Sequence, residues 1–260
     1  MSGASIVLDV VTDPSPTRRL SLSGCFNFRD LGGYRTGDGR RIRWRRLFRA
    51  DGLTRLDQDD CAILADLGLS TVIDLRTPLE LEERGVFPTH HLEVEYHHLP
   101  LTDVLPPDRD LERYGEPVFV TDRYRQMFSE GSEALARAVR VLSAPGALPA
   151  VFHCSAGKDR TGILAALVLG FLGVPEAVIV EDYILSAEAM VLLMERLKAE
   201  YPDSAEDVER FAPAVTTVAA ESMAAFLEAL ADEHGGFDDL AARWDLTDAV
   251  GRLRRELLEA

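Results

Sequence analysis

The chain has 260 residues, 47% of them hydrophobic, which is enough to bury the core of one sizeable domain. Its 44 acidic residues outnumber 28 basic ones, and the resulting net charge of −16 repels nucleic acid and anionic lipid surfaces. The longest apolar run, residues 163–175, is too short to span a bilayer, so we expect no nucleic-acid partner and no stable membrane association.

The cysteines and histidines do not predict a metal site. Cys25, Cys61 and Cys154 are odd in number and lack metal-ligand spacing, and the pairs His90-His91 and His97-His98 have no partnering carboxylate–histidine motif. Met1–Ser5 does not resemble the start of a secretory signal. These features predict a protein of the reducing cytoplasm that needs no metal and no cofactor.

The N-terminal half predicts short strands alternating with short helices. Residues 1–24 are expected to form an N-terminal strand and link, followed by a single domain over residues 25–260. Gly37-Asp38-Gly39 predicts the turn of a hairpin, and Thr77-Pro78-Leu79-Glu80 predicts a capping box at a helix start. The expected elements are a strand over 6–11, a hairpin over 34–48, a helix over 56–67 ended by Gly68, a strand over 70–75, a helix over 77–84 ended by Gly85, a strand over 94–99 and an active-site loop over 100–117.

The C-terminal half predicts one more strand and then only helices. The expected elements are helices over 121–129 and 132–143, a strand over 149–152, a helix over 163–169, and helices over 175–184, 186–200, 217–233 and 247–258, with a break at Gly235-Gly236. The alternation predicts an α/β fold, a central, mostly parallel sheet flanked by helices. Residues 175–260 are expected to form a helical lid or subdomain.

The most informative segment is His153-Cys154-Ser155-Ala156-Gly157-Lys158-Asp159-Arg160-Thr161-Gly162, between the last expected strand and a helix. Unpaired N–H groups and the helix dipole attract an anion there, and the same field favours the reactive thiolate of Cys154. Arg160 can bind two phosphate oxygens as a fork, and Gly157 allows close backbone approach. The pattern predicts phosphate binding by residues 155–161, with Thr161 placing a hydroxyl near the sulfur.

This loop resembles that of the bacterial cysteine-dependent tyrosine and dual-specificity phosphatases, which reads H-C-x-x-G-K-D-R. The resemblance continues in blocks at residues 27–34, 47–51, 72–76 and 182–186, with Ala50 where serine is usual. It implies a phosphatase fold whose helical C-terminal third partly covers the site. It also implies phosphoric monoester hydrolysis through a phosphocysteine on Cys154, with Arg160 stabilising the transferred group.

The proton donor for the leaving group is ambiguous in the sequence. Asp159 lies inside the loop and is our first candidate because the family pattern places functional weight on that residue. Asp74 ends a strand and is the second candidate for the proton donor. A structural role for Asp74, in a salt bridge to Arg76, is an equal alternative. Asp30 and Asp103 are expected to be structural. His153 either tunes the thiolate or is a satisfied core histidine, and it is not the base, because an ionised Cys154 needs none.

Lys158 and the segment Arg40–Arg46 can contribute positive charge. Lys158 either contacts a second phosphate or acidic group of the substrate, as similar lysines do in phosphoinositide phosphatases, or is a solvated loop residue. For Arg40–Arg46 a hairpin with half its arginines in water is favoured over a patch at the rim of the site.

The sequence leaves several classes of substrate open, and two rival functions need to be weighed against it. A phosphotyrosyl protein leads, with phosphoserine or phosphothreonine proteins, phosphoinositides and small phosphorylated metabolites as alternatives. A sulfurtransferase of the rhodanese type has a loop one residue shorter, and the five residues between Cys154 and Arg160 argue against it. A phosphate-binding pseudo-enzyme usually lacks the cysteine or the arginine, and both are present.

Overall fold

The computed structural model describes residues 17–102, 110 and 112–260, and its centre is a five-stranded sheet. In spatial order the strands are β1 (Arg29–Asp30), β3 (Leu47–Ala50), β6 (Ala150–His153), β4 (Thr71–Asp74) and β5 (Glu95–His98). Only β1 is antiparallel to its neighbour, and β3, β6, β4 and β5 run parallel. The predicted α/β fold with a mostly parallel sheet is confirmed.

The strand that leads to the cysteine is the middle one, and it is buried on both faces. All residues of β6 are inaccessible, as expected for a parallel strand covered by helices on either side. Its side chains alternate between two cores: Ala150 and Phe152 join the larger cluster, while Val151 joins the smaller one. Two-sided burial fixes the register of β6, and therefore the position at which the following loop starts.

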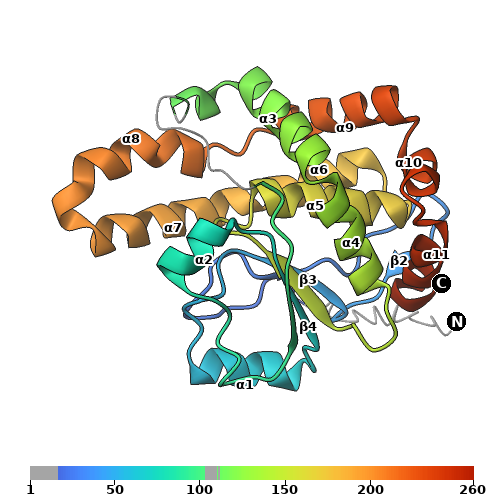
Figure 1. Ribbon diagram of the computed structural model, residues 1–260, viewed down its shortest axis with the longest axis horizontal. Helices are drawn as coiled ribbons and strands as arrows, with labels where there is room; N and C mark the ends of the chain where they lie inside the picture. Colours follow the sequence, from blue (N-terminus) through green and yellow to red (C-terminus); the bar gives the residue numbers. More distant parts are fainter. Residues whose placement is uncertain (1–16, 103–109, 111) are drawn as a thin grey trace, which may run out of the picture.

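Helices cover the two faces unequally (Figure 1). The larger core lies beneath most of the helices, and the smaller one packs against α1. The helices are α1 (Gln58–Asp66), α2 (Pro78–Arg84), α3 (Pro117–Glu130), α4 (Ser132–Leu142), α5 (Asp159–Phe171), α6 (Glu176–Ile184), α7 (Ser186–Glu200), α8 (Ala205–Thr216), α9 (Ala220–His234), α10 (Phe237–Arg243) and α11 (Thr247–Leu257), with short 3-10 turns η2 (Glu112–Gly115) and η3 (Pro202–Ser204).

Most predicted elements are found within a few residues of their expected bounds. The capping box is formed, because Thr77 accepts from the backbone of Glu80 and the Glu80 carboxylate accepts from the backbone of Thr77. Gly68 and Gly85 follow their helices in positive-φ conformations, which glycine adopts at little cost. The strand expected over 6–11, residues 12–16 of the link after it, Asp103 and much of the loop over 100–117 lie outside the described residues.

Four elements differ from the prediction. Helices α8 and α10 were not expected, and Pro213 lies inside α8, where local propensity argues against a helix. The hairpin ends at Ile42, not Phe48, because β2 (Arg41–Ile42) pairs with β7 (Leu258–Glu259) at the other end of the chain. β7 also corrects the expectation that everything after residue 175 is helical. Long-range pairing of this kind leaves no local sequence pattern.

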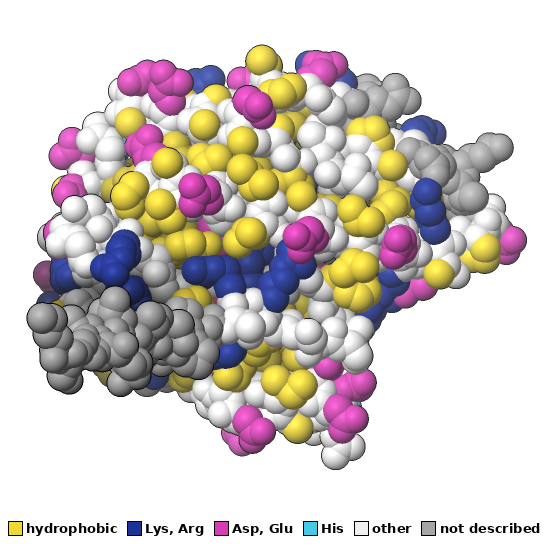
Figure 2. All heavy atoms as spheres, turned by 180° about the vertical axis from the view of Figure 1, so that it is seen from behind, with side chains coloured by type: hydrophobic (Ala, Val, Ile, Leu, Met, Phe, Trp, Pro, Cys, Tyr) yellow, Lys and Arg dark blue, Asp and Glu magenta, His cyan; other side chains and the backbone are white. Residues whose placement is uncertain are grey.

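The surface carries its charges unevenly. Figure 2 shows dark-blue Lys and Arg side chains gathered in a band across the middle of one face, with acidic groups scattered around it. None of the helices in the described ranges is both long and apolar enough to cross a bilayer.

Candidate active site

The loop from Cys154 to Arg160 joins the carboxyl end of β6 to the first turn of α5. Cys154 directly follows the strand and is 2% exposed, while α5 begins at Asp159. Gly157 has φ +66°, and a Cβ there would lie 2.4 Å from the carbonyl oxygen of Ala50 at the end of β3. Glycine is therefore required twice, for its conformation and for the close packing of loop against strand.

Neighbouring segments bind the carbonyl groups of this loop. The Asn27 side-chain amide donates to the carbonyls of Ala156 and Gly157, both at 3.1 Å. Arg49 donates to the carbonyl of Gly157 at 2.7 Å. The backbone N–H of Gly52 donates to the carbonyl of Ser155 at 3.0 Å. Because these partners bind the carbonyl groups on the outer side of the loop, the backbone N–H groups of the loop remain available to bind an anion at the N-terminus of α5.

A buried ionic network supports these contacts. Asp182 on α6 accepts from Arg49 at 2.6 Å, from Arg29 at 3.2 Å and from the Tyr34 hydroxyl at 2.9 Å. Burial acts to raise the pKa of Asp182, but the two guanidinium groups outweigh it and hold the pKa well below its usual range. Arg29 also donates to the side-chain oxygen of Asn27, so the network extends to the loop.

The same contacts explain the blocks of sequence that resemble the phosphatases. Asn27 and Arg29 come from the first block, Arg49 from the second and Asp182 from the fourth. Sequence reasoning assigned none of them a function. Their presence in the blocks that resemble the phosphatases was the available signal. Together these residues position the loop.

Glu80 is a further residue that sequence reasoning missed. Its two oxygens accept from the Arg160 guanidinium at 2.5 and 2.9 Å, and Oε1 also accepts from the Ser155 hydroxyl. Burial acts to raise the pKa of Glu80, but hydrogen bonds from Arg160 outweigh it and lower the pKa to about 2. Its place in the capping box was the only signal, and that signal predicts a helix start, not an active-site contact.

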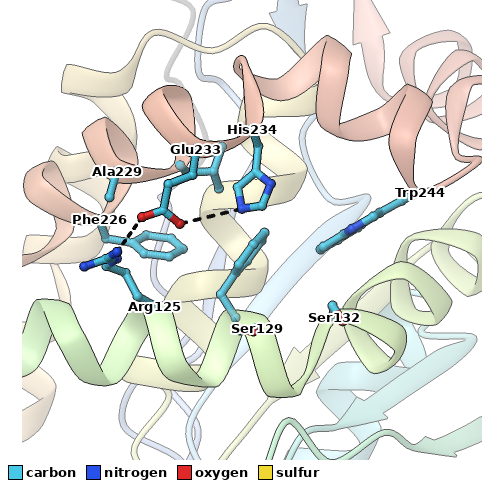
Figure 3. Close-up of a pocket in the computed structure, with 10 residues that line it drawn as sticks. Arg125, Ser129, Ser132, Phe226, Ala229, Glu233, His234 and Trp244 are labelled. Atoms are coloured by element: carbon cyan, nitrogen blue, oxygen red, sulfur yellow. Dashed lines mark hydrogen bonds and ion pairs between the residues drawn. The ribbon is translucent and has the colours of Figure 1, made fainter.

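Asp159 stands at the N-terminus of α5 with part of its side chain exposed. Its Oδ1 accepts from the Tyr124 hydroxyl on α3 at 2.5 Å, and Tyr124 lies 2.7 Å from the hydroxyl of Tyr183. Burial raises the pKa of Tyr124, and Asp159 raises it further, so the phenol stays protonated and donates. Behind Tyr124, the ring of Phe226 packs edge to face and lines a separate hollow of about 260 Å³ between α3 and α9 (Figure 3).

Asp74 is buried and fully partnered. It accepts from Arg76 at 2.9 and 2.6 Å and from the Tyr96 hydroxyl at 2.8 Å. Burial acts to raise the pKa of Asp74, while His153 and Arg76 lower it by more, so the carboxylate stays ionised. Its environment matches the structural alternative stated for it, the salt bridge to Arg76.

His153 and Thr161 lie on either side of the loop and are both buried. His153 Nδ1 donates to the carbonyl of Cys154 at 3.2 Å, and burial lowers the pKa of His153. Its Nε2 lies 3.5 Å from a carboxylate oxygen of Asp74 and forms no hydrogen bond with the described residues. The Thr161 hydroxyl has no hydrogen-bond partner among the described residues, which leaves it available to a group bound in the loop.

Lys158 points away from open solvent. Its ammonium group is buried and donates to the carbonyls of Ala214 at 2.6 Å, Thr217 at 3.0 Å and Val215 at 3.2 Å. An ammonium has three protons, so this arrangement occupies all of them. The contacts join the loop to the C-terminal end of α8.

The segment Arg40–Arg46 does not reach the loop. Arg46 precedes β3, at the end of the sheet opposite Cys154, and Ile42 pairs with Leu258 near the C-terminus. Gly37 at the hairpin turn donates to the carbonyl of Gly173, beyond the far end of α5. The alternative of a patch at the rim of the site is therefore wrong, because the pairing of β2 with β7 holds this segment elsewhere.

Comparison with known proteins identifies the family. The family model described as "Tyrosine phosphatase family" matches residues 20–259. The chain is 32% identical to the triple specificity protein phosphatase PtpB of Mycobacterium tuberculosis over 91% of this chain and 98% of the relative. It is also 32% identical to a putative tyrosine-protein phosphatase of Cupriavidus necator, over 78% of this chain and 74% of the relative.

Solved structures resemble it more distantly. The catalytic domain of the PP-IP phosphatase SIW14 from S. cerevisiae aligns with TM-score 0.33 and 16% identity, over 60% of this chain and 75% of that chain. In the residues described here, no group of three or more His, Cys, Asp or Glu side chains could hold a metal ion. The family match covers nearly the whole sequence, so the chain belongs to the tyrosine phosphatase family, it is a hydrolase, and the resemblance drawn from its loop is confirmed.

Proposed function

We propose that the protein dephosphorylates phosphotyrosyl proteins through a phosphocysteine formed on Cys154. The observation that carries the proposal is the loop itself, whose carbonyls are bound by Asn27, Arg49 and Gly52 while Arg160 reaches in from the start of α5. N–H groups arranged in this way stabilise the charge that develops on the phosphoryl oxygens.

The reaction divides into two displacements. The Cys154 thiolate attacks phosphorus in line, the S–P bond forms, and the ester P–O bond breaks as the leaving oxygen takes a proton. Water then attacks phosphorus, the S–P bond breaks, and inorganic phosphate leaves with the thiolate restored. Arg160 donates one proton from each Nη to Glu80, so its remaining N–H groups, on Nε and on each Nη, are the ones that bind equatorial oxygens in both steps.

Asp159 is the proposed proton donor to the leaving group. Its side chain is partly exposed beside the loop. The Tyr124 hydroxyl binds its Oδ1, and its Oδ2, which lies 3.7 Å from the Lys158 ammonium, is the oxygen that would face the ester oxygen. In the second step the same carboxylate accepts a proton from water. Asp74 is a weaker candidate because its oxygens are held by Arg76 and Tyr96 and its low pKa keeps it unprotonated.

A single phosphate group is the recognised feature of the proposed substrate. Lys158 donates all three of its protons to carbonyls near the end of α8, which disfavours direct contact with a second substrate phosphate. The named relatives are a tyrosine phosphatase and a triple specificity phosphatase, so phosphoserine and phosphothreonine peptides are the second candidates.

A turnover panel with matched variants tests the proposal. Phosphotyrosine, phosphoserine and phosphothreonine peptides, a phosphoinositide and a sugar phosphate are compared as substrates, and we expect the phosphotyrosine peptide to have the highest kcat/KM. Asp159→Asn is expected to slow hydrolysis of esters with a basic leaving group by about 10²–10⁴, and of activated esters much less. If Asp74→Asn alone shows this dependence on the leaving group, Asp159 is not the acid.

The nucleophile has its own test. Cys154→Ser is expected to abolish turnover while phosphate-analogue binding survives, because the N–H groups and Arg160 remain. Residual turnover above about a tenth of wild type would contradict covalent catalysis by Cys154.

A further inference from the structure

A cationic hollow lies away from the catalytic loop. It has a volume of about 330 Å³ and is bounded by the loop over residues 143–148, which precedes β6, and by α11. Arg46, Arg252 and Arg255 line it, against a single carboxylate, Glu256. A net positive hollow stands out on a chain whose net charge is −16.

The charges of these arginines are largely uncompensated. Arg46 and Glu256 are 3.9 Å apart, at the limit of an ion pair. Within the described part of the chain, Arg252 donates to Ser143 alone, to its backbone carbonyl at 3.3 Å and weakly to its hydroxyl. Arg255 has no ion pair or hydrogen bond with the residues that the structure describes. Helix C-termini favour basic residues, which accounts for Arg255 in the last turn of α11, but not for Arg46 on a different segment.

The hollow and the catalytic loop lie at opposite ends of the sheet. Arg46 precedes β3, and its carbonyl accepts from the backbone N–H of Ala150 at the start of β6. Cys154 follows the last residue of β6, so the strand separates them by roughly 13 Å or more at about 3.3 Å per residue. Figure 1 shows α11 at one side of the molecule and α2, which carries Glu80, at the other.

We infer that this hollow binds a compact phosphate-type oxyanion, independently of the catalytic loop. Planar guanidinium forks match two oxygens of a tetrahedral anion, and three arginines from two segments line this hollow. The volume lies at the lower end of the range for small-molecule sites, so a small multiply charged anion fits better than a bulky one. The anion is either free or carried on a peptide, and the chemistry recognised is the same.

Calorimetric titration with inorganic pyrophosphate tests the inference. We expect two binding events on the full chain, one at the catalytic loop and one at the hollow. The double variant Arg252→Gln/Arg255→Gln is expected to lose the second event, with affinity reduced at least about tenfold, while kcat/KM for an aryl phosphate stays unchanged. The affinity is also expected to fall as sodium chloride rises, because the hollow is open to solvent.

Arg137→Gln supplies the matched control, since it removes the same charge from an exposed arginine of α4 outside the hollow. It is expected to retain both events. Arg46→Gln, on the other wall, is expected to weaken the same event, so the result does not depend on one variant folding well. A phosphopeptide titrated in parallel identifies the source: tighter binding than pyrophosphate means a peptide-borne group, and weaker binding means a free anion. A single event on the wild-type chain that persists in the double variant, or two events on the double variant, would overturn the inference.

Discussion

The pair formed by Glu80 and Arg160 leads to the sharpest prediction. Glu80→Gln preserves the shape of the side chain and its place in the capping box, but it removes the charge and replaces one acceptor oxygen with a donor. Arg160 is 8% exposed, so its guanidinium would keep its charge with one partner oxygen lost. Removing one member of a buried ion pair costs about 3–5 kcal/mol of unfolding free energy.

The free energy that the Glu80–Arg160 pair contributes to stability can also be derived from the pKa of Glu80. Its value falls from 4.5 to about 2 on folding, and a difference of this size corresponds to about 3 kcal/mol of stability at neutral pH. Because the folded pKa is the lower one, this contribution is present above about pH 5 and is lost as the pH falls towards 2. The melting temperature of a chain of this size would drop by about 6–12 °C.

Urea unfolding of wild type and Glu80→Gln at pH 7, 4 and 3 checks the reasoning. We expect a stability difference of about 3 kcal/mol at pH 7 that shrinks steadily as the pH falls. Glu83→Gln changes the same charge at an exposed position of α2 and is expected to show neither effect. Turnover by Glu80→Gln should fall by about tenfold or more, because Arg160 loses the group that orients it. A difference below about 1 kcal/mol, or one that does not change with pH, would refute the stabilising effect expected of this ion pair.

Three further changes test other parts of the site. Gly157→Ala forces a side chain into a positive-φ position against the Ala50 carbonyl, so we expect activity to fall by at least about a hundredfold, with a lower melting temperature in calorimetry. Tyr124→Phe removes the hydrogen bond that orients Asp159, and kcat should fall by about tenfold for esters with basic leaving groups, whereas activated esters should be little affected in stopped-flow assays. Lys158→Ala leaves three carbonyls near the end of α8 unpaired, so amide hydrogen exchange in that segment should accelerate. If the variant instead loses more kcat/KM for a multiply charged ester than for an aryl phosphate, Lys158 contacts the substrate.

The chemistry of the site could be predicted from the sequence because the residues responsible lie close together along the chain. Cys154, Gly157 and Arg160 belong to one loop, and the strand before it and the helix after it have local signatures of their own. Helix starts and ends were likewise predicted from caps and glycines, which act over a single turn. These features identify the family, the reaction and the sheet that holds the loop.

The residues that support the loop could not be predicted from the sequence, because their partners lie far along the chain. Glu80 meets Arg160 across 80 positions, and Arg29 meets Asp182 across 153. A carboxylate near a helix start predicts a cap whether or not an arginine packs against it, so only the tertiary structure distinguishes the two uses.

The same limit applies to Lys158 and Arg46. The sequence places one in the loop and the other in a basic run, and both resemble substrate contacts on charge alone. The fold turns the first towards carbonyls near the end of α8 and holds the second at the opposite end of the sheet. Local sequence determines which groups are available for the reaction, but the direction in which a long charged side chain points depends on which distant segments pack beside it.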